Sequence, residues 1–198
     1  MQVSHLTLLL SIFLCSCGPA QNDDTATTED SAHQHEMSAA AEGPQPKSKS
    51  PHTTTMGNIG NAHVHIEYSS PSVRGRTIWG GLVAYDQVWS TGAHNATAVN
   101  FSEPVRVGNI ELEAGTYAFF TIPGRENWTV ILNENYDQHL ADDYDESLDR
   151  VRVNVTPERL DQPVESLTYA VEPGADGHGA ITVAWDSLKI ALHIATIK

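Results

Sequence analysis

Two histidines and a glutamate with the spacing of metal ligands stand in residues 61–68, where apolar and polar side chains alternate. Because successive side chains of a β-strand point to opposite faces, we expect His63, His65 and Glu67 to share one face. Residues two apart lie about 6.5–7 Å apart along a strand, so both imidazoles can lean onto one ion at about 2.0–2.1 Å. The pattern predicts half of a metal site. The alternative is an exposed polar sheet face.

Two further histidines fall in segments that we expect to be loops. His94 lies in a glycine-bearing loop before a predicted strand, and His139 lies in a loop that follows another predicted strand. Loops at strand ends are where a rigid β scaffold usually carries function. With His63 and His65, these residues would form a four-nitrogen site suited to copper(II) or zinc. Glu67 would replace one ligand or orient an imidazole as an outer-shell acceptor.

Copper is favoured over zinc as the bound ion, because imidazoles are crowded in this chain and the general affinity order also favours copper. A weaker, auxiliary group of ligands, His33, His35 and Met37, lies near the N-terminus, and its thioether suits copper(I). The alternative for this group is a polar linker that contains histidines by chance. We favour that alternative, since a flexible segment loses chain entropy when it closes around an ion.

Two other functions stay open. The first is a non-enzymatic interaction or ligand-binding module of a cell-envelope assembly, which would use the region of Trp79 and Trp89 and the acidic surface. The second is a zinc-dependent hydrolase in which three histidines hold zinc, water fills an open position and Glu67 acts as the base. Both tryptophans lie in alternating apolar patterns, however, which is typical of core residues.

Composition and missing motifs exclude several classes of protein. The chain has 11 basic and 25 acidic residues and a net charge of −14, which would repel the phosphate backbone of a nucleic acid. It contains no Gly-x-Ser-x-Gly elbow, no phosphate-cradling glycine loop and no His-Glu-x-x-His helix. Serine hydrolysis and hydride transfer therefore lack their usual signals. No run of about 18 or more apolar residues predicts a transmembrane helix.

The candidate ligands need a rigid scaffold, and residues 59–198 predict one made of strands. Short runs of period two are bounded there by Gly, Pro, Asn and Asp. About nine or ten strands of this length suit an all-β fold, either an antiparallel β-sandwich or an irregular barrel. We expect residues 116–122 to be a central strand, residues 105–112 to form a hairpin with a two-residue turn, and residues 156–160 to allow one helical turn. The last strands are expected to turn at Asp186-Ser187.

The N-terminus is typical of an exported bacterial lipoprotein. An apolar run over residues 6–14 is followed by Ser16 and Cys17, and the Leu-x-Ser-Cys ending resembles a lipobox. We predict that residues 1–17 are a signal peptide ending at the lipidated Cys17; the alternative is a cleaved secretory signal. Either prediction places the domain outside the cytoplasm, and the first anchors it to a membrane in the periplasm or at the cell surface.

Residues 18–57 and 58–198 differ sharply in composition. The first segment is rich in Ala, Ser, Thr, Gln, Asp and Pro and lacks a hydrophobic period, which predicts a disordered tether. The second carries all the predicted strands. We therefore expect a single β domain over residues 58–198.

Five short motifs stand in the predicted domain: Tyr68-Ser69-Ser70-Pro71, Ile78-Trp79-Gly80-Gly81, Thr91-Gly92-Ala93, Ala114-Gly115-Thr116-Tyr117 and Phe120-Thr121-Ile122-Pro123. Together they resemble a known bacterial family, the domain of unknown function numbered 2911. The resemblance implies an exported β domain, often on lipoproteins, with no established activity. This chain differs from the commoner family pattern by carrying His63, His65 and His94, so a metal role would belong to a histidine-bearing subgroup.

Overall fold

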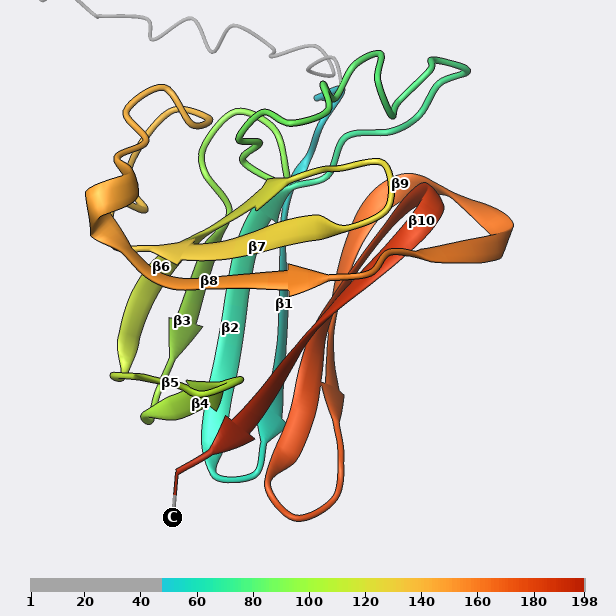
Figure 1. The fold of residues 1–198 in the computed structure, drawn as a ribbon. Helices are drawn as coiled ribbons and strands as arrows, with labels where there is room; N and C mark the ends of the chain where they lie inside the picture. Colours follow the sequence, from blue (N-terminus) through green and yellow to red (C-terminus); the bar gives the residue numbers. More distant parts are fainter. Residues whose placement is uncertain (1–47, 198) are drawn as a thin grey trace, which may run out of the picture. The chain divides into compact units, whose positions relative to one another are not determined.

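The computed structural model describes residues 48–197 of the 198-residue chain, and these residues form two antiparallel β-sheets that pack face to face (Figure 1). The predicted all-β sandwich is therefore confirmed. One sheet has six strands in the order β1-β2-β3-β6-β7-β8, and the other has four in the order β5-β4-β10-β9. The strands are β1 (His52–Ile59), β2 (Ala62–Ser69), β3 (Ala98–Phe101), β4 (Val105–Val107), β5 (Ile110–Leu112), β6 (Gly115–Ile122), β7 (Trp128–Asn133), β8 (Asp149–Val155), β9 (Glu158–Pro173) and β10 (His178–Thr196), with a short 3-10 helix η1 (Glu146–Leu148).

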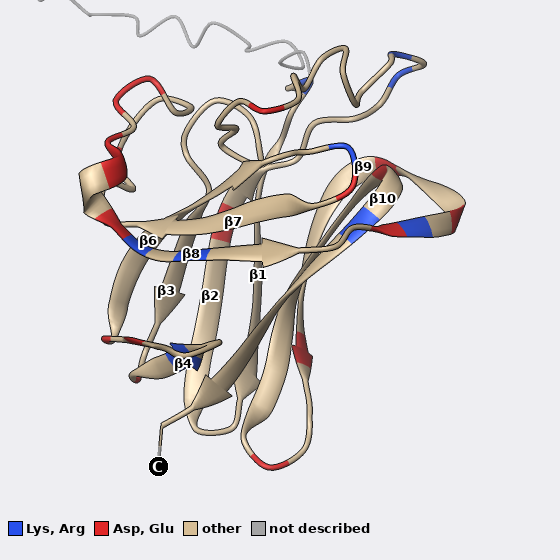
Figure 2. Cartoon of the chain, in the orientation of Figure 1, with Lys and Arg blue, Asp and Glu red and all other residues tan. Residues whose placement is uncertain are grey.

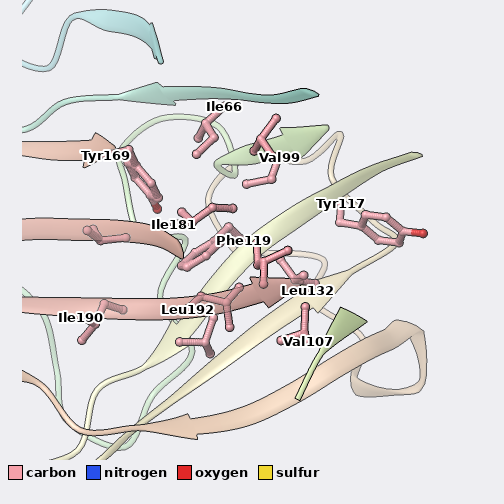
Figure 3. Close-up of a cluster of buried hydrophobic side chains, with 14 of the residues drawn as sticks. Ile66, Val99, Val107, Tyr117, Phe119, Leu132, Tyr169, Ile181, Ile190 and Leu192 are labelled. Atoms are coloured by element: carbon pink, nitrogen blue, oxygen red, sulfur yellow. The ribbon is translucent and has the colours of Figure 1, made fainter. Parts of the chain in front are cut away.

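Alternating side chains decide which face of each strand meets the other sheet. In β2, Ala62, Val64 and Ile66 are fully buried, whereas the polar residues between them lie on the outer face. Burying apolar surface between two sheets is the main term that stabilises such a sandwich. Figure 3 shows the result, with Phe119 of β6 and Ile181 of β10 in the cluster of apolar side chains between the strands.

The strand β6 is central and buried on both faces, as its continuous apolar sequence predicts. Phe119 points into the core between the sheets, whereas Phe120 belongs to a second apolar cluster on the outer face of the six-stranded sheet. The predicted hairpin over residues 105–112 is also confirmed, as β4 and β5. Val107 pairs with Ile110 across a two-residue turn, and Gly108 takes the positive φ of 60° that the turn requires.

The C-terminal strand β10 doubles back on itself. A straight strand of its 19 residues would span roughly 60 Å. Instead, the amide of Thr196 donates a hydrogen bond of 2.9 Å to the carbonyl of Gly177, which directly precedes the strand. The reversal lies at Asp186, where φ is 51° and the pairing with β9 shifts register. The expected change of direction at Asp186-Ser187 is present, but as an irregularity within one continuous strand.

Two expectations from the sequence are wrong: a helical turn over residues 156–160 and the start of the domain at residue 58. Residues 156–160 form no helical turn, because Glu158 and Arg159 already pair with β10 as the start of β9. The domain also begins before residue 58, since β1 starts at His52 and pairs with β2 along its whole length. Its first three inward positions are Thr53, Thr55 and Gly57, and only the last, Ile59, is large and apolar. The hydrophobic alternation that marks a buried strand is therefore missing over residues 52–57.

All four tryptophans of the chain meet in one aromatic cluster of the core. The ring of Trp79 lies 4.8 Å from that of Trp128 and 6.0 Å from those of Trp89 and Trp185. These distances are typical of favourable aromatic pairs. The expectation that the tryptophans are core residues is confirmed. Among residues 48–197, no helix is both long and apolar enough to cross a membrane.

The core predicts a large effect of removing Phe119, which is fully buried and lies 5.6 Å from the ring of Tyr169. We expect Phe119→Ala to lower the free energy of unfolding by about 3–5 kcal/mol, because it removes buried apolar surface and leaves a cavity. Chemical denaturation of the full chain checks this value. Arg159→Ala, which changes an exposed side chain of β9, is the control and should stay within about 0.5 kcal/mol of wild type.

Candidate functional site

The outer face of β1 and β2 carries a row of polar side chains. His63, His65 and Glu67 share this face, as the alternation predicts, and the side chains of His65 and Glu67 are 31% and 52% exposed. The Nδ1 atom of His65 lies 3.8 Å from Oε1 of Glu67. Across the strand pair, Met56 stands directly opposite His65, and Asn58 stands directly opposite His63.

A groove of about 430 Å³ begins beside this row and crosses the outer face of β1, β2, β3 and β6. Apart from Tyr68, which faces the core, its floor comes from strand residues that face outward, and one end is closed by residues of the loops before β3 and after β7. None of the described residues that line the groove is a lysine or an arginine. The lining residues are His52, His65, Glu67, Tyr68, Ser69, Asn95, Ala96, Ala98, Asn100, Thr116, Tyr136 and Asp137.

The two loops that close the groove are joined by their backbones. Asn95 and His139 form an isolated antiparallel bridge, and the amide of Leu140 donates a hydrogen bond of 2.7 Å to the carbonyl of His94. His94 and Leu140 both have positive φ, at 65° and 49°. Non-glycine residues occupy this region at a cost in conformational energy, and such residues often cluster at functional sites.

Buried amide side chains fix the loop after β7, residues 134–148. Gln138 is 7% exposed, donates to the carbonyl of Asn135 at 2.6 Å and accepts from the amide of Asp143 at 3.0 Å. Asn133 is fully buried and donates to Asp149 at 2.8 Å. Figure 2 shows that this connection between β7 and β8 is also rich in acidic residues. The hydrogen bonds hold the loop in one conformation, because breaking them would leave buried polar atoms unpaired.

Tyr144 attaches the same loop to the sheet. Its ring packs edge to face on Phe120 at 5.5 Å, and its hydroxyl donates to Oδ2 of Asp149 at 2.8 Å. Burial, followed by the hydrogen bond to Asp149 and the negative charge of that carboxylate, raises the pKa of Tyr144 to about 12. The folded state therefore favours the neutral phenol.

The structure does not bring the four predicted histidine ligands into one metal site. Among residues 48–197, no three His, Cys, Asp or Glu side chains are grouped so that they could hold one ion. His65 lines the groove, but His63, His94 and His139 do not. The Nδ1 atom of His139 instead lies 2.8 Å from Oδ2 of Asp142 on the surface. The same finding applies to the three-histidine zinc centre that a hydrolase would need.

Some predicted functional residues lie outside the described part of the chain, and some groove residues were not predicted. The lipidation residue Cys17 and the auxiliary ligands His33, His35 and Met37 belong to the first group. The second group comprises His52, Asn95, Asn100, Thr116, Tyr136 and Asp137. Tyr136 and Asp137 lie three and two residues before His139. An aromatic and an acidic residue in a short loop were therefore the available signal.

The pKa of Tyr144 predicts how stability responds to alkaline pH. Because the folded-state value is raised from 10.0 to about 12, its contribution to stability is complete below pH 10 and is lost as the pH rises through about 12. We expect Tyr144→Phe to reduce the fall in unfolding free energy over this range, as measured by denaturant titrations at several pH values. Tyr136→Phe, which changes an exposed ring of the same loop, serves as the control, and an equal effect of both variants would contradict the prediction.

Comparison with known proteins gives a family and no function. A family model described as a protein of unknown function, DUF2911, matches residues 50–194, which include all but the ends of the folded domain. No curated protein and no solved structure matches the chain. The match covers most of the 198 residues and agrees with the resemblance of the motifs around Tyr68 and Trp79. The chain therefore belongs to the DUF2911 family.

Proposed function

We propose that this protein is a ligand-binding module, lipid-anchored outside the cytoplasm, that holds a small neutral or cationic molecule rich in hydroxyl and amine groups, such as an amino sugar. The groove on the outer face of the six-stranded sheet is its binding site. The observation that carries the proposal is that the groove lining, within residues 48–197, offers carboxylates, amides and hydroxyls and includes neither a lysine nor an arginine. The volume of about 430 Å³ falls within the usual range of small-molecule sites, about 300–1,000 Å³.

The negative charges around the groove favour a neutral or positively charged ligand. Glu67 and Asp137 line it, and the whole chain has a net charge of −14. An anionic ligand such as a sugar phosphate would meet repulsion and no fixed cation, whereas an ammonium group would be attracted to both carboxylates. The ligand is therefore neutral or positively charged.

The polar groups of the groove favour a ligand with several hydroxyl groups. The side-chain amides of Asn95 and Asn100 can donate and accept hydrogen bonds, and Thr116 adds a hydroxyl group. The oxygen of this hydroxyl, Oγ1, already accepts a hydrogen bond of 2.9 Å from the amide of Asn100. Tyr136 is 44% exposed and offers an aromatic ring at the groove. An aromatic ring can pack against the C–H face of a sugar or the charge of an amine.

The rigidity of the surrounding structure supports binding without a large change in shape. The floor consists of paired strands, and the end wall consists of two loops held by the Asn95–His139 bridge and the buried amide of Gln138. A site that is ordered before binding loses less conformational entropy when the ligand enters.

Titration of the full chain with glucosamine, followed by amide NMR, tests this proposal. We expect saturable shifts at groove residues with a dissociation constant of about 1 mM or tighter. Glu67→Gln should weaken binding by about tenfold, since one attractive charge is lost. Glu113→Gln, which changes an exposed carboxylate outside the groove, is the matched control.

Glucose 6-phosphate provides the opposite charge in the same experiment. It should cause no saturable shifts at the groove. Binding of the phosphate at least as tight as that of glucosamine would contradict the proposal, and so would the absence of groove shifts with glucosamine.

The anchor is a separate part of the proposal and rests on the lipobox-like sequence ending at Cys17. We expect the full chain, expressed in bacteria, to incorporate labelled palmitate and to sediment with membranes. Cys17→Ser should abolish both, because the modified thiol is missing, whereas Cys15→Ser should retain them. Equal membrane association of the Cys17 variant and wild type would contradict lipidation.

A further inference from the structure

A methionine stands exposed on the outer face of the edge strand β1, outside the groove. Met56 is 58% exposed, although the alternating residues of β1 on this face are otherwise polar. The strand register places it directly opposite His65 of β2. Side chains opposite each other in an antiparallel pair have Cβ atoms about 4.5–5.5 Å apart. A thioether sulfur and an imidazole are therefore neighbours on an open surface.

His63 adds a second imidazole next to this pair. It lies two residues from His65 on the same face, which makes it a diagonal neighbour of Met56. Its Nδ1 atom lies 3.0 Å from Oδ1 of Asn58, the residue opposite it in the register. An amide oxygen only accepts, and a neutral imidazole that donates to it from Nδ1 keeps the lone pair of Nε2 for a metal.

We propose that Met56, His63 and His65 bind one copper(I) ion on the outer face of β1 and β2. Thioether sulfur selects copper(I) among the common biological metals, and imidazole suits it as well. All three side chains reach solvent, so rotations about side-chain bonds suffice to bring the donor atoms together. Asn58 orients the imidazole of His63 from outside the ligand set, through the 3.0 Å contact to its Nδ1 atom. Glu67 lies 3.8 Å from Nδ1 of His65, which is too far for a hydrogen bond.

The copper site and the groove share His65 but can be tested apart. Met56 and His63 do not line the groove, and Tyr136 lines it from the loop after β7 rather than from a strand next to the proposed ligands. Asn100 also lines the groove, but it stands directly opposite His65. A variant of Met56 therefore addresses copper alone, and a variant of Tyr136 addresses the groove ligand alone.

Competition with a chromophoric copper(I) chelator under anaerobic, reducing conditions tests the site in the full chain. The chain also carries His33, His35 and Met37 and the thiols of Cys15 and Cys17, which bind copper(I) strongly. The measurements therefore use a background in which His33, His35 and Met37 are replaced by alanine and both cysteines by serine. We expect this background to retain one copper(I) ion. X-ray absorption of the complex should show a sulfur neighbour together with nitrogen neighbours.

Met56→Leu is the decisive variant, because it preserves side-chain volume at an exposed position and leaves the fold intact. It should weaken copper(I) binding by at least about tenfold, because loss of even an outer-shell partner of a metal ligand has an effect of this size. It should also remove the sulfur neighbour from the X-ray absorption spectrum. Thr54→Ala, the next outward position of β1 and opposite Glu67, is the matched control and should bind as the background does. Unchanged affinity of Met56→Leu, or binding of zinc without copper(I), would overturn the proposal.

Discussion

The outer face of the six-stranded sheet must be covered where it is apolar and can remain bare where it is polar. Phe120 and Ile131 on this face are fully buried because the loop of residues 134–148 packs over them through Ala141 and Tyr144. The polar half, on β1 and β2, needs no cover. The groove lies where the covering loop ends and the polar half begins, so its position follows from the distribution of apolar residues between neighbouring strands.

Local patterns in the sequence were sufficient for those parts of the fold that depend on local geometry. The alternation in residues 61–68 predicts which side chains of β2 face outward, and Gly108-Asn109 predicts the turn of a hairpin. The strand β1 was missed because Thr53, Thr55 and Gly57 occupy all of its inward positions except the last. Whether loop histidines meet depends on backbone conformations far apart in the chain. His94 and His139 are brought near each other by a backbone bridge, yet the imidazole of His139 binds Asp142.

The same alternation that exposes two imidazoles also makes them available to two kinds of ligand. His65 faces Met56 on one side and the polar groove on the other, with Glu67 next to it. A metal ion and an organic ligand at adjoining positions would each change the affinity for the other by the same factor, as thermodynamic linkage requires. The sign of that coupling depends on whether the ligand contacts the ring of His65 or the carboxylate of Glu67.

The doubled-back strand β10 has a consequence for how the protein is made. In the four-stranded sheet, β10 lies between β4 and β9, and Ala195 pairs with Arg106 near the middle of the chain. The hairpin β4–β5 therefore cannot join this sheet until the last residues have left the ribosome. Contacts so distant in sequence slow folding, so the nascent chain stays incompletely folded until the second half of β10 has been synthesised.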